Sequence, residues 1–400
     1  MLLMAWEKIF PQTVGILPSP FSVILVPYTN TENLNEILEL NFSNIPSEWR
    51  FFKEIYLGNF DKAKEEISYL EDEELKDYTI TILKFSQSND FSVLKNFKGH
   101  RLLEKLLSLL NPEEVMNVEL TEREDFYVFS EFIKAKFLQN KDTSRAIAHL
   151  DNALRYFSFE SPIFKAQVLL SKANIIFNEK GASYHLIQLY LEILELLKNV
   201  NIPELKGEIF YQLGNLYSTF GDIYEAVKYY SKALEVFTKE NNPYMYALIN
   251  NNMGLAYLSI QATDIESQVK LALGVQCLKK ALEVFKKEEF PEEWASATLN
   301  YANALVYLPT SNPTKNLIRA LELYKEVLAY REKTGNMEGY ARVLANMGNV
   351  LAHLGHLKEA KKKLKKAREI FISLKLFEEA AGVDEILKEI QSMEAAKNGE

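Results

Sequence analysis

Small and large apolar residues recur along the chain with the spacing of one helical face. In each copy they occupy positions i, i+4 and i+7, which lie on one side of a helix because a turn takes 3.6 residues. Four clear sets are Ala226, Tyr230, Ala233; Gly274, Leu278, Ala281; Ala320, Tyr324, Val327; and Ala360, Leu364, Ala367. Two weaker sets precede them: Ala146, Leu150, Ala153 and Leu186, Tyr190, Ile193. The pattern predicts six repeated helices.

The spacing of the sets predicts the length of a repeat. Their first positions are 146, 186, 226, 274, 320 and 360, so the steps are 40, 40, 48, 46 and 40 residues. The two long steps coincide with the predicted loops at 261–268 and 309–314. Repeat proteins accept insertions at such turns, where stacking is not disturbed. We therefore expect a helical repeat array with a period of about 40 residues.

A second helix with its own pattern precedes each of the last four sets. It carries a small residue and, three positions later, a large one; the pairs are Gly214 and Tyr217, Gly254 and Tyr257, Ala302 and Leu305, and Gly348 and Leu351. Small residues allow close helix packing, and large ones fill the space beside them. Pro162, Pro203, Pro243 and Pro291 are expected at helix starts, where a missing N–H is tolerated.

The paired helices resemble a known family. Their spacing, with Gly221-Asp222 and Gly355-His356 between the helices of a pair, is similar to the tetratricopeptide repeat over about residues 126–374. The period resembles the long-helix variety found in kinesin light chain-like bacterial repeats. The resemblance implies an all-α fold, a right-handed superhelical solenoid of antiparallel helix pairs with a divergent, mostly helical N-terminal part.

We expect three regions. Residues 1–125 form the divergent helical region, which includes one degenerate repeat around Gly58 and Ala63 and a short strand or extended apolar segment at 21–28. Residues 126–375 form the array of about six helix pairs. Residues 376–400 form a capping helix and a frayed tail, because the last pair would otherwise expose its stacking side.

Composition and charge exclude several classes of function. The net charge is −9, whereas nucleic-acid binding needs a basic surface, so no nucleic-acid partner is expected. No run of eighteen apolar residues predicts a membrane span, and Pro11 and Pro18 interrupt the N-terminal apolar run, against a cleaved signal. The single cysteine, Cys277, fits a reducing compartment. We expect a cytoplasmic protein.

The resemblance implies that the first helix of each pair faces a concave groove. The positions one after and two before its small residue, together with neighbouring groove positions, supply the expected partner-binding residues: Asn174, Tyr211, Asn215, Asn252, Asn300, Asn303, Arg342, Asn346 and Asn349. An asparagine amide both donates and accepts hydrogen bonds, so it can hold a peptide backbone whatever the side chains. The alternative is that the asparagines bond between neighbouring helices and fix their stacking.

The sequence contains no motif that indicates a function other than binding. There is no Gly-rich phosphate loop, no HExxH and no GxSxG, so neither catalysis nor a cofactor is expected. His353 and His356 have no third ligand apart from Glu359, so no metal is expected. The basic run from Lys358 is interpreted as the solvated outer side of a helix, with an acidic partner as the alternative.

These observations favour a non-catalytic scaffold or adaptor that binds a protein or peptide partner in its groove. A second hypothesis is a regulatory receptor, in which a small peptide or the apolar N-terminal segment occupies the groove and switches the shape of the array. The polar last helix favours a monomer over self-assembly through the C-terminal end, and a homo-oligomer is the third possibility.

Overall fold

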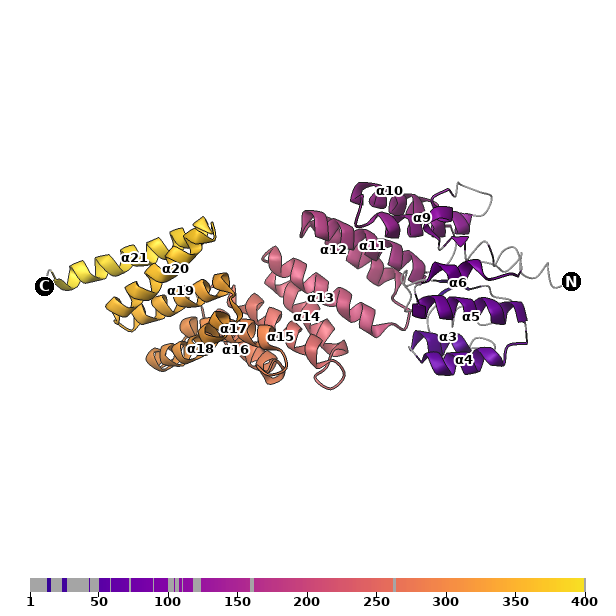
Figure 1. Ribbon diagram of the computed structural model, residues 1–400. Helices are drawn as coiled ribbons and strands as arrows, with labels where there is room; N and C mark the ends of the chain where they lie inside the picture. The colour runs from indigo at the N-terminus through magenta and orange to yellow at the C-terminus, as the bar shows by residue number, and fades with distance from the viewer. Residues whose placement is uncertain are drawn as a thin grey trace. The chain divides into compact units, whose positions relative to one another are not determined.

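The structure is a computed structural model that describes residues 13–15, 24–26, 43, 50–57, 59–71, 73–88, 90–99, 104, 108–109, 111–117, 124–158, 162–261 and 264–398. The chain divides into two compact units, Met1–Lys206 (unit 1) and Gly207–Glu400 (unit 2). Figure 1 shows the helices of each unit. Gly58, the turn of the expected degenerate repeat, lies outside the described residues.

Unit 1 begins with a short hairpin and continues with helices. Strands β1 (Thr13–Gly15) and β2 (Ile24–Val26) pair antiparallel, with Thr13 opposite Val26. The helices are α3 (Arg50–Tyr56), α4 (Phe60–Ser68), α5 (Glu73–Ser88), α6 (Phe91–Lys95), α8 (Pro112–Val115), α9 (Glu124–Leu138), α10 (Thr143–Arg155), α11 (Pro162–Lys180) and α12 (Tyr184–Leu196). Ile24–Val26 is therefore a strand, which is one of the two forms expected for residues 21–28. Its partner, β1, lies outside those residues.

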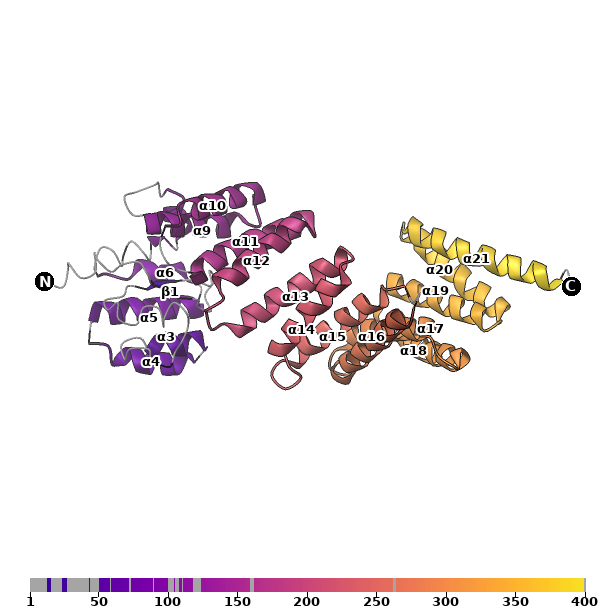
Figure 2. The same ribbon diagram turned by 180° about the vertical axis from the view of Figure 1, so that it is seen from behind.

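Helix α13 (Pro203–Thr219) runs from the last residues of unit 1 into unit 2. Unit 2 continues with α14 (Ile223–Val236), α15 (Pro243–Leu258), α16 (Ile265–Val284), α17 (Pro291–Tyr307), α18 (Pro313–Thr334), α19 (Met337–His353), α20 (Leu357–Ser373) and α21 (Phe377–Asn398). From α14 onward each helix packs against the next one along the chain, and Figure 2 shows the same succession from behind. Unit 2 holds four of the predicted helix pairs: α13–α14, α15–α16, α17–α18 and α19–α20.

The helix boundaries follow local chemistry. Each of the four predicted prolines is the first residue of its helix, α11, α13, α15 or α17. The Asp222 side chain accepts the backbone N–H of Glu225 (3.2 Å) and so caps α14. The preceding residue, Gly221, has a φ of +78°, and its counterpart Gly355 has +80°. Other residues avoid this region, which explains why glycine separates the helices of these two pairs.

The small–large–small pattern marks the core. Every residue of the six sets is buried; the alanines are fully covered, and Tyr230 and Tyr324 are only 1% exposed. Gly214 lies against the ring of Tyr230, so that an added Cβ would be 2.5 Å from Cδ1. The tyrosine thus fills the space beside a residue that cannot be larger. The all-α array of antiparallel helix pairs predicted from this pattern is confirmed.

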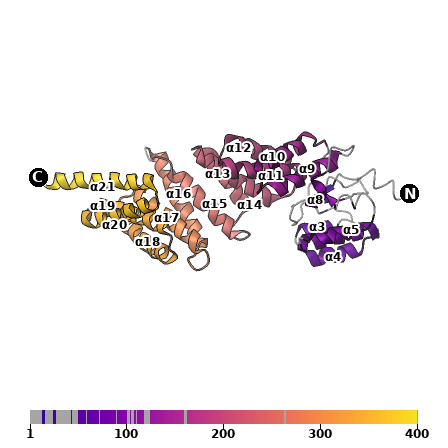
Figure 3. The same ribbon diagram turned by 45° about the horizontal axis from the view of Figure 1, so that its top comes forward.

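Helix α21 is the last described helix of unit 2. It packs against α20, and Figure 3 shows it beside the α19–α20 pair. Ala380, Val383 and Ile390 are buried against the α19–α20 core. Arg368 and Lys361 of α20 form ion pairs with Asp384 and Glu394 of α21, the first at 2.6 Å. Part of the basic run is therefore engaged with the capping helix.

Candidate binding face on unit 2

The first helices of the four pairs in unit 2 expose polar amides on one side. We call this surface the amide face; its members are Tyr211 and Asn215 of α13, Asn251, Asn252 and Leu255 of α15, Asn300 and Asn303 of α17, and Asn346 and Asn349 of α19. All of them are half-buried except Leu255, which is 41% exposed. The face therefore contains the predicted binding residues of unit 2 other than Arg342.

A hydrogen-bonded group centres on Asn215. Its Oδ1 accepts the hydroxyl of Tyr230, from the second helix of the same pair, at 2.8 Å. It also accepts Nδ2 of Asn252, from the next pair, at 3.1 Å. Asn252 Nδ2 donates in addition to the hydroxyl of Tyr211 (2.9 Å). Burial raises the pKa of Tyr230 and of Tyr211, so both hydroxyls stay protonated at neutral pH.

The same arrangement is repeated two pairs further on. Asn303 Oδ1 accepts the hydroxyl of Tyr324 at 2.7 Å and Nδ2 of Asn346 at 2.9 Å. Between the two groups, Asn300 Nδ2 donates to Asn251 Oδ1, and Asn251 Nδ2 donates to Asn252 Oδ1, both at 3.1 Å. Amide hydrogen bonds therefore connect α13 to α15, α15 to α17, and α17 to α19. This is the stacking role that the sequence left open as the alternative.

Part of the hydrogen-bonding capacity of these amides is still available. Asn303 uses only its oxygen, and its Nδ2 group donates to no residue within the described ranges. Asn349 makes no side-chain hydrogen bond to another described residue; the position that tyrosine holds in the other two groups is Leu364 here. The pair α15–α16 has leucine at both positions, Leu255 and Leu278. The face is therefore an amide surface with one apolar interruption.

Two predicted binding residues lie elsewhere. Arg342 is on the first turns of α19, where it forms ion pairs with Glu338 (2.9 Å) and with Glu379 of α21 (2.8 Å). Its guanidinium thus ties α19 to the capping helix. Asn174 is exposed on α11 and belongs to unit 1.

The amide face has no charged side chains along most of its length. No Asp, Glu, Lys or Arg occurs in residues 209–219 of α13, 243–258 of α15, 294–307 of α17 or 343–352 of α19. In contrast, nine of the 17 residues of α20 are charged. Charge is therefore segregated to the second helices and to the first turns of α13, α17 and α19.

Sequence reasoning missed three members of the hydrogen-bonded groups, Tyr230, Tyr324 and Asn251. Both tyrosines were assigned to the core, where their rings do lie, but each hydroxyl reaches an amide of the face. The sequence did contain a signal, which is that the residues at these two positions of a helix pair change together. Asparagine occurs with tyrosine in two pairs, Asn215 with Tyr230 and Asn303 with Tyr324, whereas Leu255 occurs with Leu278.

Among the described residues, no group of three histidine, cysteine or acidic side chains could hold a metal ion. None of the described helices combines the length and hydropathy that crossing a bilayer requires. Cys277 is 5% exposed, and burial raises the pKa of its thiol.

Comparisons with known proteins identify the repeat. Residues 207–238, from α13 through α14, match the model of the tetratricopeptide repeat. No curated protein sequence is significantly similar to the chain. A similar solved structure is a signal transduction ATPase with numerous domains and a tetratricopeptide repeat sensor from Pyrococcus horikoshii: 15% identity and a TM-score of 0.52, over 90% of this chain and 52% of that one. The chain thus spans about half the length of that protein.

Two further solved structures are less similar in fold. BtubC from P. vanneervenii is 18% identical with a TM-score of 0.42, over 64% of this chain and 93% of its own. Aspartyl phosphate phosphatase F from Bacillus subtilis is 15% identical with a TM-score of 0.44, over 88% and 81%. The matched repeat and the fold shared with the Pyrococcus structure agree with the pattern of the core: residues 207–238 match a tetratricopeptide repeat, and they lie within an array of helix pairs.

Proposed function

We propose that the amide face of unit 2 binds an extended, uncharged segment of a partner protein, and that the chain acts as a non-catalytic scaffold or adaptor. The observation that carries this proposal is the combination of free amide donors with an absence of charge. The Nδ2 group of Asn303 and the whole amide of Asn349 can pair with peptide backbone, which offers carbonyl and N–H groups in every residue except the N–H of proline.

The geometry suits an extended peptide. Packed helices lie about 8–10 Å apart, and a strand rises about 3.3 Å per residue, so one repeat corresponds to about three peptide residues. The asparagines on successive first helices can then meet the backbone at regular intervals. The amides of Asn215 and Asn303 are held in place by Tyr230, Tyr324 and the asparagines of the next pair, so these two side chains lose little entropy on binding.

The composition of the face sets the kind of partner. An acidic or basic segment would be desolvated there without an opposite charge, which is unfavourable. An uncharged segment loses only backbone hydration, which the amides replace. Leu255, 41% exposed, offers a contact for one apolar side chain of the partner.

The two roles of the asparagines can be separated by substitution. Replacing Asn303 and Asn349 with aspartate keeps the oxygen that accepts from Tyr324 and Asn346 but removes the free donors and repels peptide carbonyls. The matched control is Tyr324→Phe, which removes a hydrogen bond of the stacking group without changing the exposed face. We would select peptides from a random display library on the full chain and measure their affinity by fluorescence anisotropy.

We expect the Asn303→Asp, Asn349→Asp variant to lose binding while its helicity is unchanged, and Tyr324→Phe to bind within about twofold of the natural chain. The proposal is wrong if the aspartate variant binds normally. Equal loss of binding in both variants would instead assign the asparagines to stacking alone.

One observation favours the regulatory receptor as a second candidate. Strand β1 contacts α11, the first helix of a predicted repeat and the helix that carries Asn174. Residues 13–15 therefore lie against α11 within unit 1. Deleting residues 1–30 distinguishes the candidates: higher affinity for the selected peptide supports self-occupation, unchanged affinity contradicts it, and loss of helicity shows that the segment is part of the core.

A further inference from the structure

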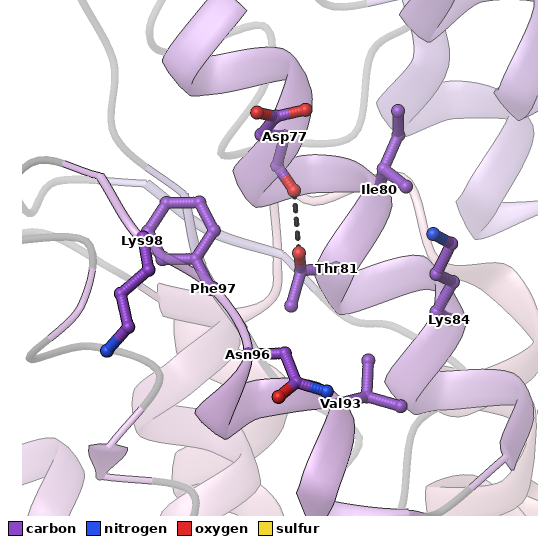
Figure 4. Close-up of a pocket in the computed structure, with 8 residues that line it drawn as sticks. All are labelled: Asp77, Ile80, Thr81, Lys84, Val93, Asn96, Phe97 and Lys98. Carbon is purple, nitrogen blue, oxygen red and sulfur yellow. Dashed lines mark hydrogen bonds between the residues drawn. The ribbon is translucent and has the colours of Figure 1, made fainter.

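Unit 1 contains a pocket of about 450 Å³ between α5 and the segment that follows α6, shown in Figure 4. Helix α5 contributes one face with the spacing i, i+3, i+4 and i+7, and the other side comes from α6 and its following loop. The lining residues are Asp77, Ile80, Thr81, Lys84, Val93, Asn96, Phe97 and Lys98. The volume lies within the range of about 300–1,000 Å³ that small-molecule sites occupy.

The floor of the pocket is apolar and held in place. Phe97 is 7% exposed, and its ring packs edge to face on Tyr78 with centroids 6.1 Å apart. Tyr78 is itself 2% exposed, so the Phe97 ring rests on the core of unit 1. Ile80 and Val93 are half-buried and lie on the side of the pocket opposite Phe97 in Figure 4. A ligand with a small apolar group would therefore meet a preformed surface, which lowers the entropy lost on binding.

Three ionised groups surround this floor without neutralising one another. Asp77, Lys84 and Lys98 are exposed, and none of them forms an ion pair with another residue that the structure describes. Elsewhere on α5, Lys76 is paired with Glu73 at 3.3 Å, so the helix does pair its charges where partners are in reach. Figure 4 shows Lys84 and Lys98 on opposite sides of the pocket and Asp77 at a third position.

Two uncharged polar groups lie between the charges. The hydroxyl of Thr81 donates to the backbone oxygen of Asp77 at 2.7 Å, so its lone pairs remain able to accept a hydrogen bond from a ligand. The amide of Asn96 can donate and accept. The pocket thus combines positive and negative charge, an amide, a hydroxyl and an apolar floor.

We infer that this pocket binds a small zwitterion with an apolar side chain, that is, a free amino acid or the end of a short peptide. Its carboxylate pairs with the ammonium of Lys84 or Lys98, its ammonium group pairs with Asp77, and its apolar side chain lies against the ring of Phe97. This site is independent of the amide face, since it is built entirely from residues of unit 1.

Other ligand classes fit the pocket less well. A phosphate ester would meet the carboxylate of Asp77 and no arginine, the residue best suited to bidentate phosphate binding. A divalent cation would find one carboxylate beside two ammonium groups. A neutral apolar molecule would leave all three charges unpaired. Only a zwitterion uses both signs of charge.

The test compares three probes that differ by one group each. L-Leucine carries both charges, L-leucinamide lacks the carboxylate, and 4-methylpentanoate lacks the ammonium group. We would titrate each probe into the full chain by isothermal calorimetry. We expect leucine to bind at millimolar concentration or below, and each analogue to bind about tenfold more weakly.

Substitutions then assign the charges. Asp77→Asn should weaken leucine binding about threefold and leave 4-methylpentanoate unchanged. Lys84→Met with Lys98→Met should weaken leucine and 4-methylpentanoate but not leucinamide. Lys95→Met is the control, because Lys95 is exposed on α6 and does not line the pocket. All four side chains are exposed, so helicity is expected to be unchanged.

Three results would overturn the inference: no heat of binding with millimolar leucine, equal affinity for leucine and 4-methylpentanoate, or equal loss of binding in Lys95→Met. The first result would show that the pocket does not bind leucine. The second would show that Asp77 does not pair with the ammonium group. The third would show that binding depends on the general charge around α6 and not on the pocket.

Discussion

Replacing Gly214 with alanine would place a Cβ atom 2.5 Å from Cδ1 and 2.6 Å from Cε1 of the Tyr230 ring. The ring cannot yield easily, since Tyr230 is 1% exposed, packs against Tyr211 and donates its hydroxyl to Asn215. The alanine must therefore displace the ring and its hydrogen bond.

The magnitude follows from three effects. Overpacking a core by one methyl group costs about 1–3 kcal/mol. Loss of the Tyr230–Asn215 hydrogen bond costs about 1 kcal/mol. Alanine is better than glycine in a helix by about 1 kcal/mol, which offsets part of this. We expect a net destabilisation of the α13–α14 pair of about 2 kcal/mol.

Hydrogen exchange with mass spectrometry measures this change locally, which suits an array whose parts can open separately. A loss of about 2 kcal/mol raises the exchange rates of the protected amides of residues 207–238 about 30-fold. The control is Gly382→Ala in α21, where an added Cβ meets no atom within 4 Å. There only helix propensity changes, and exchange in α21 should slow about fivefold.

The pair of variants makes the reasoning refutable. If Gly214→Ala exchanges at the natural rate or more slowly, the close approach of α13 to the tyrosine ring does not limit packing. If Gly382→Ala exchanges faster, the helix around this glycine is not open to solvent as the structure describes.

Three further predictions follow. Tyr230→Phe and Tyr324→Phe should each destabilise their pair by about 1 kcal/mol, seen as about fivefold faster exchange in the matching helices; no change would mean that the hydroxyls pair equally well with water. Although burial raises the pKa of Glu131, hydrogen bonds from Lys134, His149 and Asn152 lower it below its usual value. This stabilisation is complete above the unfolded pKa of about 4.3 and is lost as the pH falls through the lower folded pKa; exchange in α9 and α10, taken relative to Glu131→Gln at each pH, should rise only below about pH 4.3. Because burial raises the pKa of Cys277, iodoacetamide at pH 8 should modify it at least about tenfold more slowly than in the urea-unfolded chain, measured by intact mass; equal rates would contradict its burial.

The helices and the core of the array could be predicted because they depend on contacts at fixed spacing. Ala226, Tyr230 and Ala233 are one face of one helix, so the period of the pattern alone places them inside. Pro243 and Asp222 mark helix starts through their own backbone chemistry, which needs no knowledge of distant residues.

The hydrogen-bonded groups of the amide face depend instead on contacts between helices. Asn252 meets Asn215 across 37 positions of the chain, and the direction of each amide decides whether it stacks helices or remains free. Arg342 was assigned to the groove by its place on α19, but Glu379 of the capping helix holds it. The pocket beside Phe97 is likewise formed by two segments, α5 and α6 with its following loop. The spacing of residues along the chain does not show that these segments lie together.

The most direct test of the amide face as the binding surface is photo-crosslinking of the full chain in its host extract. A benzophenone amino acid would replace Leu255 on the amide face, or Lys362 on the exposed side of α20 as the control. The account predicts that one polypeptide is captured from position 255, that Asn303→Asp with Asn349→Asp prevents its capture, and that position 362 captures none of it. Capture of that polypeptide from position 362 alone would contradict the account and assign binding to the basic helix.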